Sequence, residues 1–201
     1  QALFNALQAI INPGDEVLVH QPSFVCYEPI VRMAGAVPVI INTKAENGFK
    51  LTPEELSAAI NDRTRMLVLP YPNNPTGGIL NREDLEKLAK VFIEKDLVVI
   101  SDEIYAELTF GKRHVSIANV EGMAERTVIA SGFSKAYAMT GWRLGYLCGP
   151  KAWIAQMTKL HQYAIMCAPT TSQFAAVEAL QNGDEDIEYM KEEYDQRRRL
   201  I

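Results

Sequence analysis

Short apolar runs rich in β-branched residues alternate with helical patterns along nearly the whole chain, and this alternation limits the possible folds. The clearest run is Leu97-Val98-Val99-Ile100, whose consecutive apolar residues suit a strand that is buried on both faces. Strands of this kind that are joined by helices form parallel sheets with helices on both sides. The sequence therefore predicts an α/β fold of three layers (αβα) around a mostly parallel central sheet.

The apolar periodicity and the helix-end signals place the individual elements. The predicted strands are Glu16–His20, Val37–Ile41, Arg65–Leu69, Leu97–Ser101, Thr127–Ala130 and Leu144–Cys148. The predicted helices are Ala2–Ile11, Phe24–Ala34, Pro53–Ile60, Arg82–Lys95, Lys151–Tyr163, Thr171–Gln181 and Asp184–Ile201. Thr52 and Glu55 form a capping-box pattern, and Asn81 suits a helix N-cap. Gly35 and Gly183 suit helix C-termini.

Composition and charge disfavour several classes of protein. The 201 residues suffice for one large domain with a sizeable core. The formal net charge is −5 and the basic residues are dispersed, so we expect no nucleic-acid surface. No apolar stretch has the length of a membrane span, and no stretch has the charged-then-apolar pattern of a signal segment. The three cysteines and three histidines lack metal-ligand spacing, so we expect no metal site and a reduced, cytoplasmic setting.

Both ends of the sequence are abrupt. Gln1 opens a helical pattern with no N-cap residue before it, and the pattern from Asp184 to Ile201 continues to the last residue. The basic run Arg197–Arg199 within it follows acidic residues, which indicates a solvated helix face. We therefore expect residues 1–201 to form one domain of a longer protein.

Polar clusters follow three of the predicted strands, at the edge where parallel sheets bind ligands. Asn74 follows Arg65–Leu69, Asp102 follows the Leu97 run, and Lys135 follows Thr127–Ala130. The three residues are 28 and 33 positions apart, close to one βαβ repeat of roughly 30 residues. We therefore expect the three side chains to converge on one edge of the sheet.

The chemistry of this set suits a pyridine cofactor that carries an aldehyde. Lys135 lies among small and aromatic residues, where desolvation would make its amine neutral and nucleophilic, as a Schiff base requires. A carboxylate, here Asp102, keeps the ring nitrogen protonated so that the ring acts as an electron sink. Tyr105 and Asn74 can donate to the ring oxygen, and Arg143 can bind a phosphate.

Other interpretations of the same residues remain open at this point. The segment Asn73–Gly77 is also a good turn, because Asn tolerates positive φ and Pro fixes φ. Asp102 and the neighbouring Glu103 could cap a helix. Arg143 could form a structural ion pair. Trp142 and Phe133 suit core packing better than ligand contact.

Three motifs together resemble the class I family of fold-type-I pyridoxal-phosphate aminotransferases, over essentially the whole chain. The motifs are Asn73-Asn74-Pro75-Thr76-Gly77, Ser101-Asp102-Glu103-Ile104-Tyr105 and the segment from Ser134-Lys135 to Arg143-Leu144-Gly145-Tyr146. The tract Leu69–Pro75 and the segment His161–Tyr163 look similar to bacterial aspartate/aromatic and acetyl-diaminopimelate-type members. The resemblance implies pyridoxal 5′-phosphate as the cofactor and an amino acid and a 2-keto acid as substrates.

The resemblance also implies a role for each site residue. Lys135 would hold the cofactor as a Schiff base and move the substrate proton, and Asp102 would contact the pyridine nitrogen. Tyr105 and Asn74 would contact the ring oxygen, and Asn74 would also border the substrate. Arg143 would bind the phosphate with Ser134. Phe24 occupies the place of the aromatic residue that stacks on the ring, although an ordinary core role stays open.

The family further implies that the chain is the large cofactor-binding domain, truncated at both ends. The phosphate loop before Gln1 and the small domain after residue 201 would be absent, with 184–201 as the helix that leads to the small domain. We therefore expect a homodimer in the full-length protein and little catalysis by this chain alone. A carbon–sulfur β-lyase or a cyclopropane-forming synthase uses the same scaffold, and a ligand-sensing domain of a transcription regulator is a non-enzymatic alternative.

Overall fold

One six-stranded sheet forms the centre of the protein in the computed structural model, which describes all 201 residues. The strand order is β2-β1-β3-β4-β5-β6. Strands β1 to β5 run parallel, and β6 pairs antiparallel with β5 at one edge. The strands are β1 (Glu16–Gln21), β2 (Val37–Asn42), β3 (Thr64–Leu69), β4 (Val98–Asp102), β5 (Thr127–Gly132) and β6 (Gly145–Cys148). All six predicted strands are confirmed, as is the mostly parallel sheet.

Seven α-helices follow the predicted order. They are α1 (Ala2–Ile10), α2 (Tyr27–Met33), α3 (Pro53–Ala59), α4 (Arg82–Glu94), α5 (Lys151–Ile165), α6 (Thr170–Asn182) and α7 (Asp184–Leu200). Helix α2 begins at Tyr27 rather than at the predicted Phe24, and its N-cap residue Cys26 makes no side-chain hydrogen bond. Phe24 therefore lies in the turn before the helix. Five short 3₁₀ turns, η1 (Ala45–Asn47), η2 (Ala106–Leu108), η3 (Ile117–Asn119), η4 (Ala124–Arg126) and η5 (Thr140–Trp142), were not predicted.

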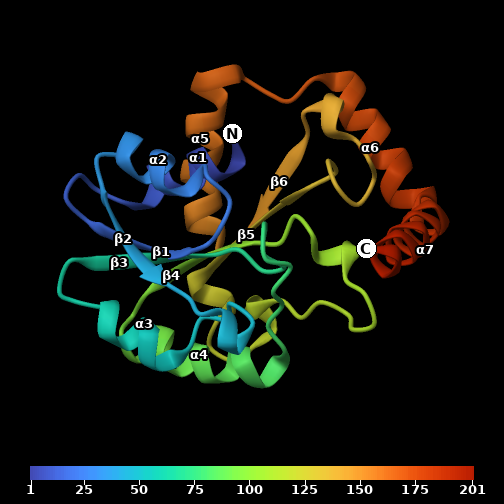
Figure 1. The fold of residues 1–201 in the computed structure, drawn as a ribbon. Coiled ribbons are helices and arrows are strands. Elements are labelled where there is room, and N and C mark those ends of the chain that lie inside the picture. The colour runs from blue at the N-terminus through green and yellow to red at the C-terminus, as the bar shows by residue number, and fades with distance from the viewer.

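Helices cover both faces of the sheet, which confirms the predicted three layers. Helices α1, α2 and α5 lie on one face and α3 and α4 on the other (Figure 1). Each face has its own apolar core, because side chains alternate along a strand. Met66 of β3 packs with Leu7 and Met157, whereas its neighbour Leu67 packs in the other core with Leu88 and Phe92.

The helix-end signals in the sequence act as predicted, with one difference. Thr52 accepts from the Glu55 amide and the Glu55 carboxylate accepts from the Thr52 amide, and Asn81 caps α4 with the same pattern. Gly35 follows α2 with φ of 77°. Gly183 ends α6 without a left-handed conformation; a Cβ there would lie 2.5 Å from the carbonyl oxygen of Ala179. Close backbone approach, not positive φ, thus favours glycine at 183.

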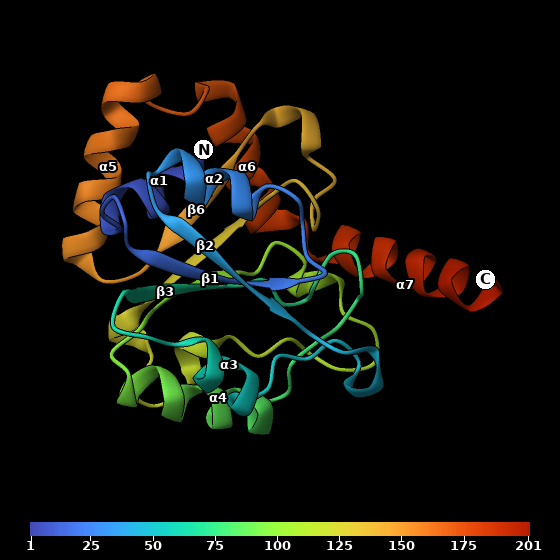
Figure 2. The same ribbon diagram turned by 60° about the vertical axis from the view of Figure 1, so that its left-hand side comes forward.

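The last helix reaches away from the sheet. Figure 2 shows α7 projecting from the rest of the protein, with the C-terminus at its far end. Helix α6 precedes it and packs beside the irregular segment between β5 and β6, where Ala176 joins Phe133 and Met139 in a small third core. None of the helices combines the length and the apolar character that crossing a lipid bilayer requires.

Candidate active site

The carboxyl ends of the neighbouring strands β3, β4 and β5 open onto the same edge of the sheet. Asn74, Asp102 and Lys135 follow or end these three strands, which confirms the predicted convergence. Asn74 Nδ2 donates a long hydrogen bond of 3.4 Å to the Tyr105 hydroxyl. Lys135 Nζ lies 5.7 Å from the centroid of the Tyr105 ring. Tyr105 therefore links the asparagine and the lysine.

Asp102 is a buried carboxylate that no cation neutralises. It is only 7% exposed; its Oδ2 accepts from the Tyr27 hydroxyl at 2.9 Å and its Oδ1 from the Ile104 amide at 3.2 Å. It takes part in none of the ion pairs of the chain. Burial raises the pKa of Asp102 above its ordinary value, although the two hydrogen bonds act in the opposite direction. A cationic N–H that approaches this carboxylate would offset the free-energy cost of burying its charge.

Tyr27, in the first turn of α2, was missed by the sequence analysis. The residue is buried, and burial together with the Asp102 charge raises the pKa of its phenol, so the hydroxyl stays protonated and donates. The position of Tyr27 in the sequence could have identified it, because α2 follows β1 and the carboxyl end of β1 opens onto this same edge. A polar aromatic residue at the start of such a helix is a candidate for the site.

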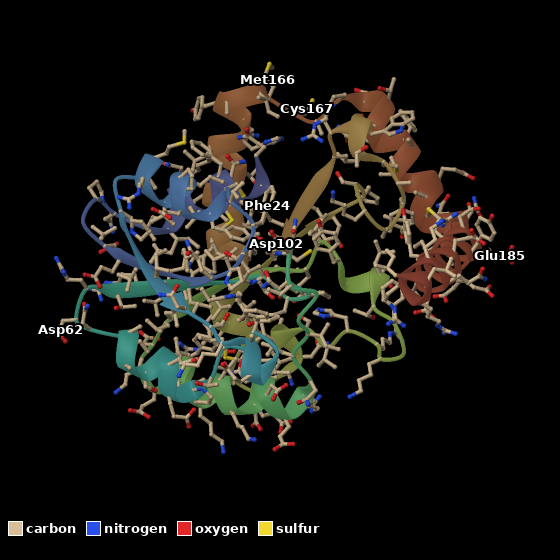
Figure 3. All side chains as sticks on the ribbon, in the orientation of Figure 1. Phe24, Asp62, Asp102, Met166, Cys167 and Glu185 are labelled. Atoms are coloured by element: carbon tan, nitrogen blue, oxygen red, sulfur yellow. The ribbon has the colours of Figure 1, made fainter.

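Phe24 lies beside Tyr27, the hydrogen-bond donor to Asp102. Its ring is 6.1 Å from the Tyr27 ring at an interplanar angle of 78°, and 45% of the residue is exposed. Figure 3 labels Phe24 and Asp102 near the centre of the view, and each of them contacts Tyr27. The interpretation of Phe24 as an ordinary core residue is therefore wrong, because nearly half of the residue is exposed.

Lys135 and Arg143 are cations without a carboxylate partner. Lys135 follows β5 in an irregular segment and is partly exposed, so it is less desolvated than the sequence suggested. Arg143 is exposed, and its guanidinium donates to the carbonyl oxygen of Thr140 at 2.7 Å. Neither residue forms an ion pair, so the interpretation of Arg143 as a structural ion-pair residue is wrong. Ser134 precedes Lys135 and is partly buried.

Phe133 and Trp142, two aromatic residues that flank Lys135 in the sequence, differ in burial. Phe133 is buried in the third core, as predicted. Trp142 is 47% exposed, so the prediction that it packs in the core is wrong. Trp142 lies in the turn η5, and Ser172 Oγ donates to its carbonyl oxygen at 2.7 Å.

The segment after β3 is a turn and a site element at once. Asn73 is buried, and its Nδ2 donates to the carbonyl oxygen of Pro22 at 2.8 Å and to Thr76 Oγ1 at 2.9 Å. The Gly77 amide donates to the Asn73 carbonyl, and Gly77 has φ of 70°. This turn fixes the backbone that presents Asn74.

A pocket of about 540 Å³ adjoins Asn74 and Tyr105. Its further walls include Pro75, Ile79, Phe110 and Arg198, with the Arg198 guanidinium 5.2 Å from the centroid of the Phe110 ring. The charge pattern of 197–199 predicted only a solvated helix face for Arg198. The predicted site residues Asn74 and Tyr105 thus border a pocket, and Arg198 of α7 forms part of its wall.

Residues 1–201, the whole chain, match the model of the family described as aminotransferase class I and II. The chain belongs to this family. As an aminotransferase-family chain, it is 49% identical over 201 residues to the Bacillus subtilis protein YugH and 43% identical over 204 residues to an aspartate aminotransferase of Pyrococcus abyssi. Each match covers 100% of this chain and 52% of the relative. The chain spans about half the length of these curated relatives.

Solved aminotransferase structures have the same fold. An aromatic aminotransferase from Pyrococcus horikoshii OT3 matches with a TM-score of 0.96 at 44% identity, covering 100% of this chain and 54% of that one. An aspartate aminotransferase from Thermus thermophilus with maleate matches with a TM-score of 0.95 at 43% identity, covering 98% and 52%. The predicted family and fold class, with their aspartate/aromatic likeness, are confirmed.

Proposed function

We propose that this chain is the cofactor-binding domain of a pyridoxal-5′-phosphate-dependent aminotransferase, which moves an amino group between an amino acid and a 2-keto acid. One observation carries the proposal: an unpaired lysine lies beside Tyr105, which also accepts a hydrogen bond from Asn74, on the sheet edge that presents the buried, uncompensated Asp102. Fold alone does not imply function, whereas these side chains offer a specific chemistry.

The charges of the site fit the proposed cofactor. Asp102 is a buried anion that lacks a cation, and a protonated pyridine nitrogen would supply one. Arg143 is an exposed cation that lacks an anion, and a phosphate would supply one. Lys135 has no carboxylate that would hold its amine away from an aldehyde. Each group lacks the partner that the cofactor carries.

When bound, pyridoxal 5′-phosphate supplies an aldehyde that condenses with amines and a ring that accepts the electron pair released when the substrate Cα loses its proton. Lys135 would bind the aldehyde carbon. After an amino acid displaces it, Lys135 would carry the proton from Cα to the cofactor carbon, first as a general base and then as a general acid. Asp102, oriented by Tyr27, would keep the proton on the ring nitrogen.

The remaining residues would bind and orient. Tyr105 and Asn74 would donate to the ring oxygen, and Asn74 would also contact the substrate. Arg143 and Ser134 would hold the phosphate, and Phe24 would pack on one face of the ring. The pocket beside Asn74 and Tyr105 offers room for the substrate.

We propose further that the chain is the large domain of a longer protein. Helix α7 would lead to a small domain, which would supply the arginine for the substrate carboxylate, and the whole protein would act as a homodimer in the cytoplasm. The length of the relatives, about twice that of this chain, supports this assignment.

The proposal is tested on the full-length protein with two assays run side by side. Transfer from aspartate or tyrosine to 2-oxoglutarate should depend on both substrates, and cysteine conjugates should release no pyruvate. Pyruvate release without a keto acid would favour the β-lyase alternative instead. Cofactor binding with no turnover in either assay would favour a ligand-sensing domain. The names of the relatives favour transamination.

A further inference from the structure

We infer that Glu103 is a positioning residue, which clamps the base of the loop that carries Tyr105 and one wall of the pocket. The inference rests on the proposed function, because it assigns Glu103 an effect on cofactor binding. Glu103 follows Asp102 directly but is not a ligand candidate, since its own oxygens are already occupied.

Glu103 is 6% exposed, and its carboxylate contacts three side chains. Its Oε1 accepts from Ser101 Oγ at 2.8 Å and from Ser116 Oγ at 2.6 Å. Its Oε2 lies 3.0 Å from His114 Nε2, close enough for an ion pair but not aligned as a hydrogen bond. Burial opposes ionisation, but these contacts hold the pKa of Glu103 below its ordinary value. Glu103 is therefore a satisfied buried anion, in contrast to Asp102.

The partners of Glu103 close a loop. Ser101 lies in β4 just before it, whereas His114 and Ser116 lie at the far end of the excursion that begins at Ile104. The excursion, residues 104–115, contains only the short turn η2 as regular structure. It carries Tyr105 and the pocket-lining residues Leu108, Thr109 and Phe110.

Both sides of the clamp are anchored to the fold. The Glu103 amide donates to the carbonyl oxygen of Ala130, and Ser131 Oγ donates to the Glu103 carbonyl oxygen at 3.3 Å, both from β5. On the other side, Ser116 Oγ accepts from the Ala118 amide and so caps η3. Glu103 thus joins β4 and the residue that caps η3 through its carboxylate, and β5 through its backbone, at the point where the loop starts and ends.

A compact loop whose ends are joined keeps its shape only while the junction holds. Tyr105 lies two residues from Glu103, and its contacts with Asn74 and Lys135 span 3.4 Å and 5.7 Å. A loop that opens at its base would move Tyr105 away from both. Loss of the clamp should therefore weaken cofactor binding although Glu103 touches no cofactor atom.

The test compares Glu103→Leu with Glu103→Gln in the full-length protein. Leucine removes every acceptor, whereas glutamine keeps an amide oxygen for the two serine hydroxyls. In the cofactor-free protein, Glu103→Leu should speed amide hydrogen exchange of residues 104–116 by about tenfold, the factor expected from one lost buried hydrogen bond. Pyridoxal-phosphate affinity, measured by absorbance titration, should fall by a similar factor. Glu103→Gln should stay within about threefold of wild type in both measurements.

Glu16→Leu is a matched control. Glu16 is also a buried carboxylate, and Asn61 Nδ2 donates to it, but it starts β1 at the opposite end of the strands. This variant should leave exchange of residues 104–116 and cofactor affinity unchanged. If Glu103→Leu does not fold, Ser116→Ala removes one donor at the far end of the loop and should accelerate the same exchange.

Two results would overturn the inference. The first is wild-type exchange of residues 104–116 in Glu103→Leu, or in Ser116→Ala if Glu103→Leu does not fold. The second is a Glu103→Gln variant that is as impaired as Glu103→Leu. The second result would mean that charge, not hydrogen bonding, is responsible. Hydrogen exchange is read without cofactor, so it tests the clamp separately. Failure of the wild-type protein to bind pyridoxal phosphate would instead refute the proposed function.

Discussion

The buried imidazole of His20 should make the fold sensitive to mild acid. His20 lies in β1 with no exposed surface, and its ring stacks on Tyr71 at 5.0 Å between centroids. Neither ring nitrogen has a hydrogen-bond partner. Burial lowers the pKa of His20 from 6.5 to about 4. The imidazole of His20 is thus protonated at a lower pH in the folded protein than in the unfolded chain.

The magnitude follows from that shift. Because the folded-state pKa is depressed, stability is unaffected above pH 6.5 and declines between pH 6.5 and about 4. Each pH unit in that window costs about 1.4 kcal/mol, so the full loss below pH 4 is about 3 kcal/mol. At pH 5 the loss is about 2 kcal/mol, a large share of the stability of an ordinary domain.

Urea denaturation between pH 7 and 4.5 measures this loss directly. His20→Phe keeps a ring against Tyr71 and removes the titration, so its free energy of unfolding should fall about 2 kcal/mol less than that of wild type between pH 7 and 5. His161→Gln, a substitution at a partly exposed histidine of α5, should follow wild type. Parallel curves for wild type and His20→Phe would refute the reasoning, whatever the stability of the variant at pH 7.

Three further predictions concern the core, the site and the domain. Phe92→Ala in the α4 core should lower the free energy of unfolding by about 3–5 kcal/mol in chemical denaturation, and Ile93→Ala, at a 41% exposed neighbour, by less than about 1.5 kcal/mol. Asp102→Asn should reduce the transamination rate of the full-length protein by at least about 100-fold, and Tyr27→Phe by about tenfold, in steady-state assays; wild-type rates in Asp102→Asn would contradict its role. The isolated 201-residue chain should show little turnover in the same assay, and robust turnover would refute the proposed division into domains.

Much of this fold was predictable because its determinants are local. The run Leu97–Ile100 marks a buried strand without reference to any other residue, and Thr52 with Glu55 marks the start of α3. Parallel topology then supplies a long-range inference. Since parallel strands end at one edge, Asn74 and Lys135 could be placed together although they are far apart in the sequence.

Contacts that depend on how a helix or a loop folds back could not be predicted in this way. The Tyr27–Asp102 hydrogen bond depends on where α2 begins, and the helix start was predicted three residues early. The Arg198–Phe110 contact depends on the direction of α7, which no local pattern encodes. Trp142 was misplaced because apolar character alone does not show that a turn carries a side chain outward.

The most direct test of the account is the site of cofactor attachment. The full-length protein is incubated with pyridoxal phosphate, reduced with borohydride, digested and analysed by mass spectrometry, alongside Lys135→Ala and the exposed-site control Lys159→Ala. The account predicts a reduced cofactor adduct on the peptide that contains Lys135 in wild type and in Lys159→Ala, and none in Lys135→Ala. A borohydride-stable adduct of equal yield in Lys135→Ala would contradict the central claim.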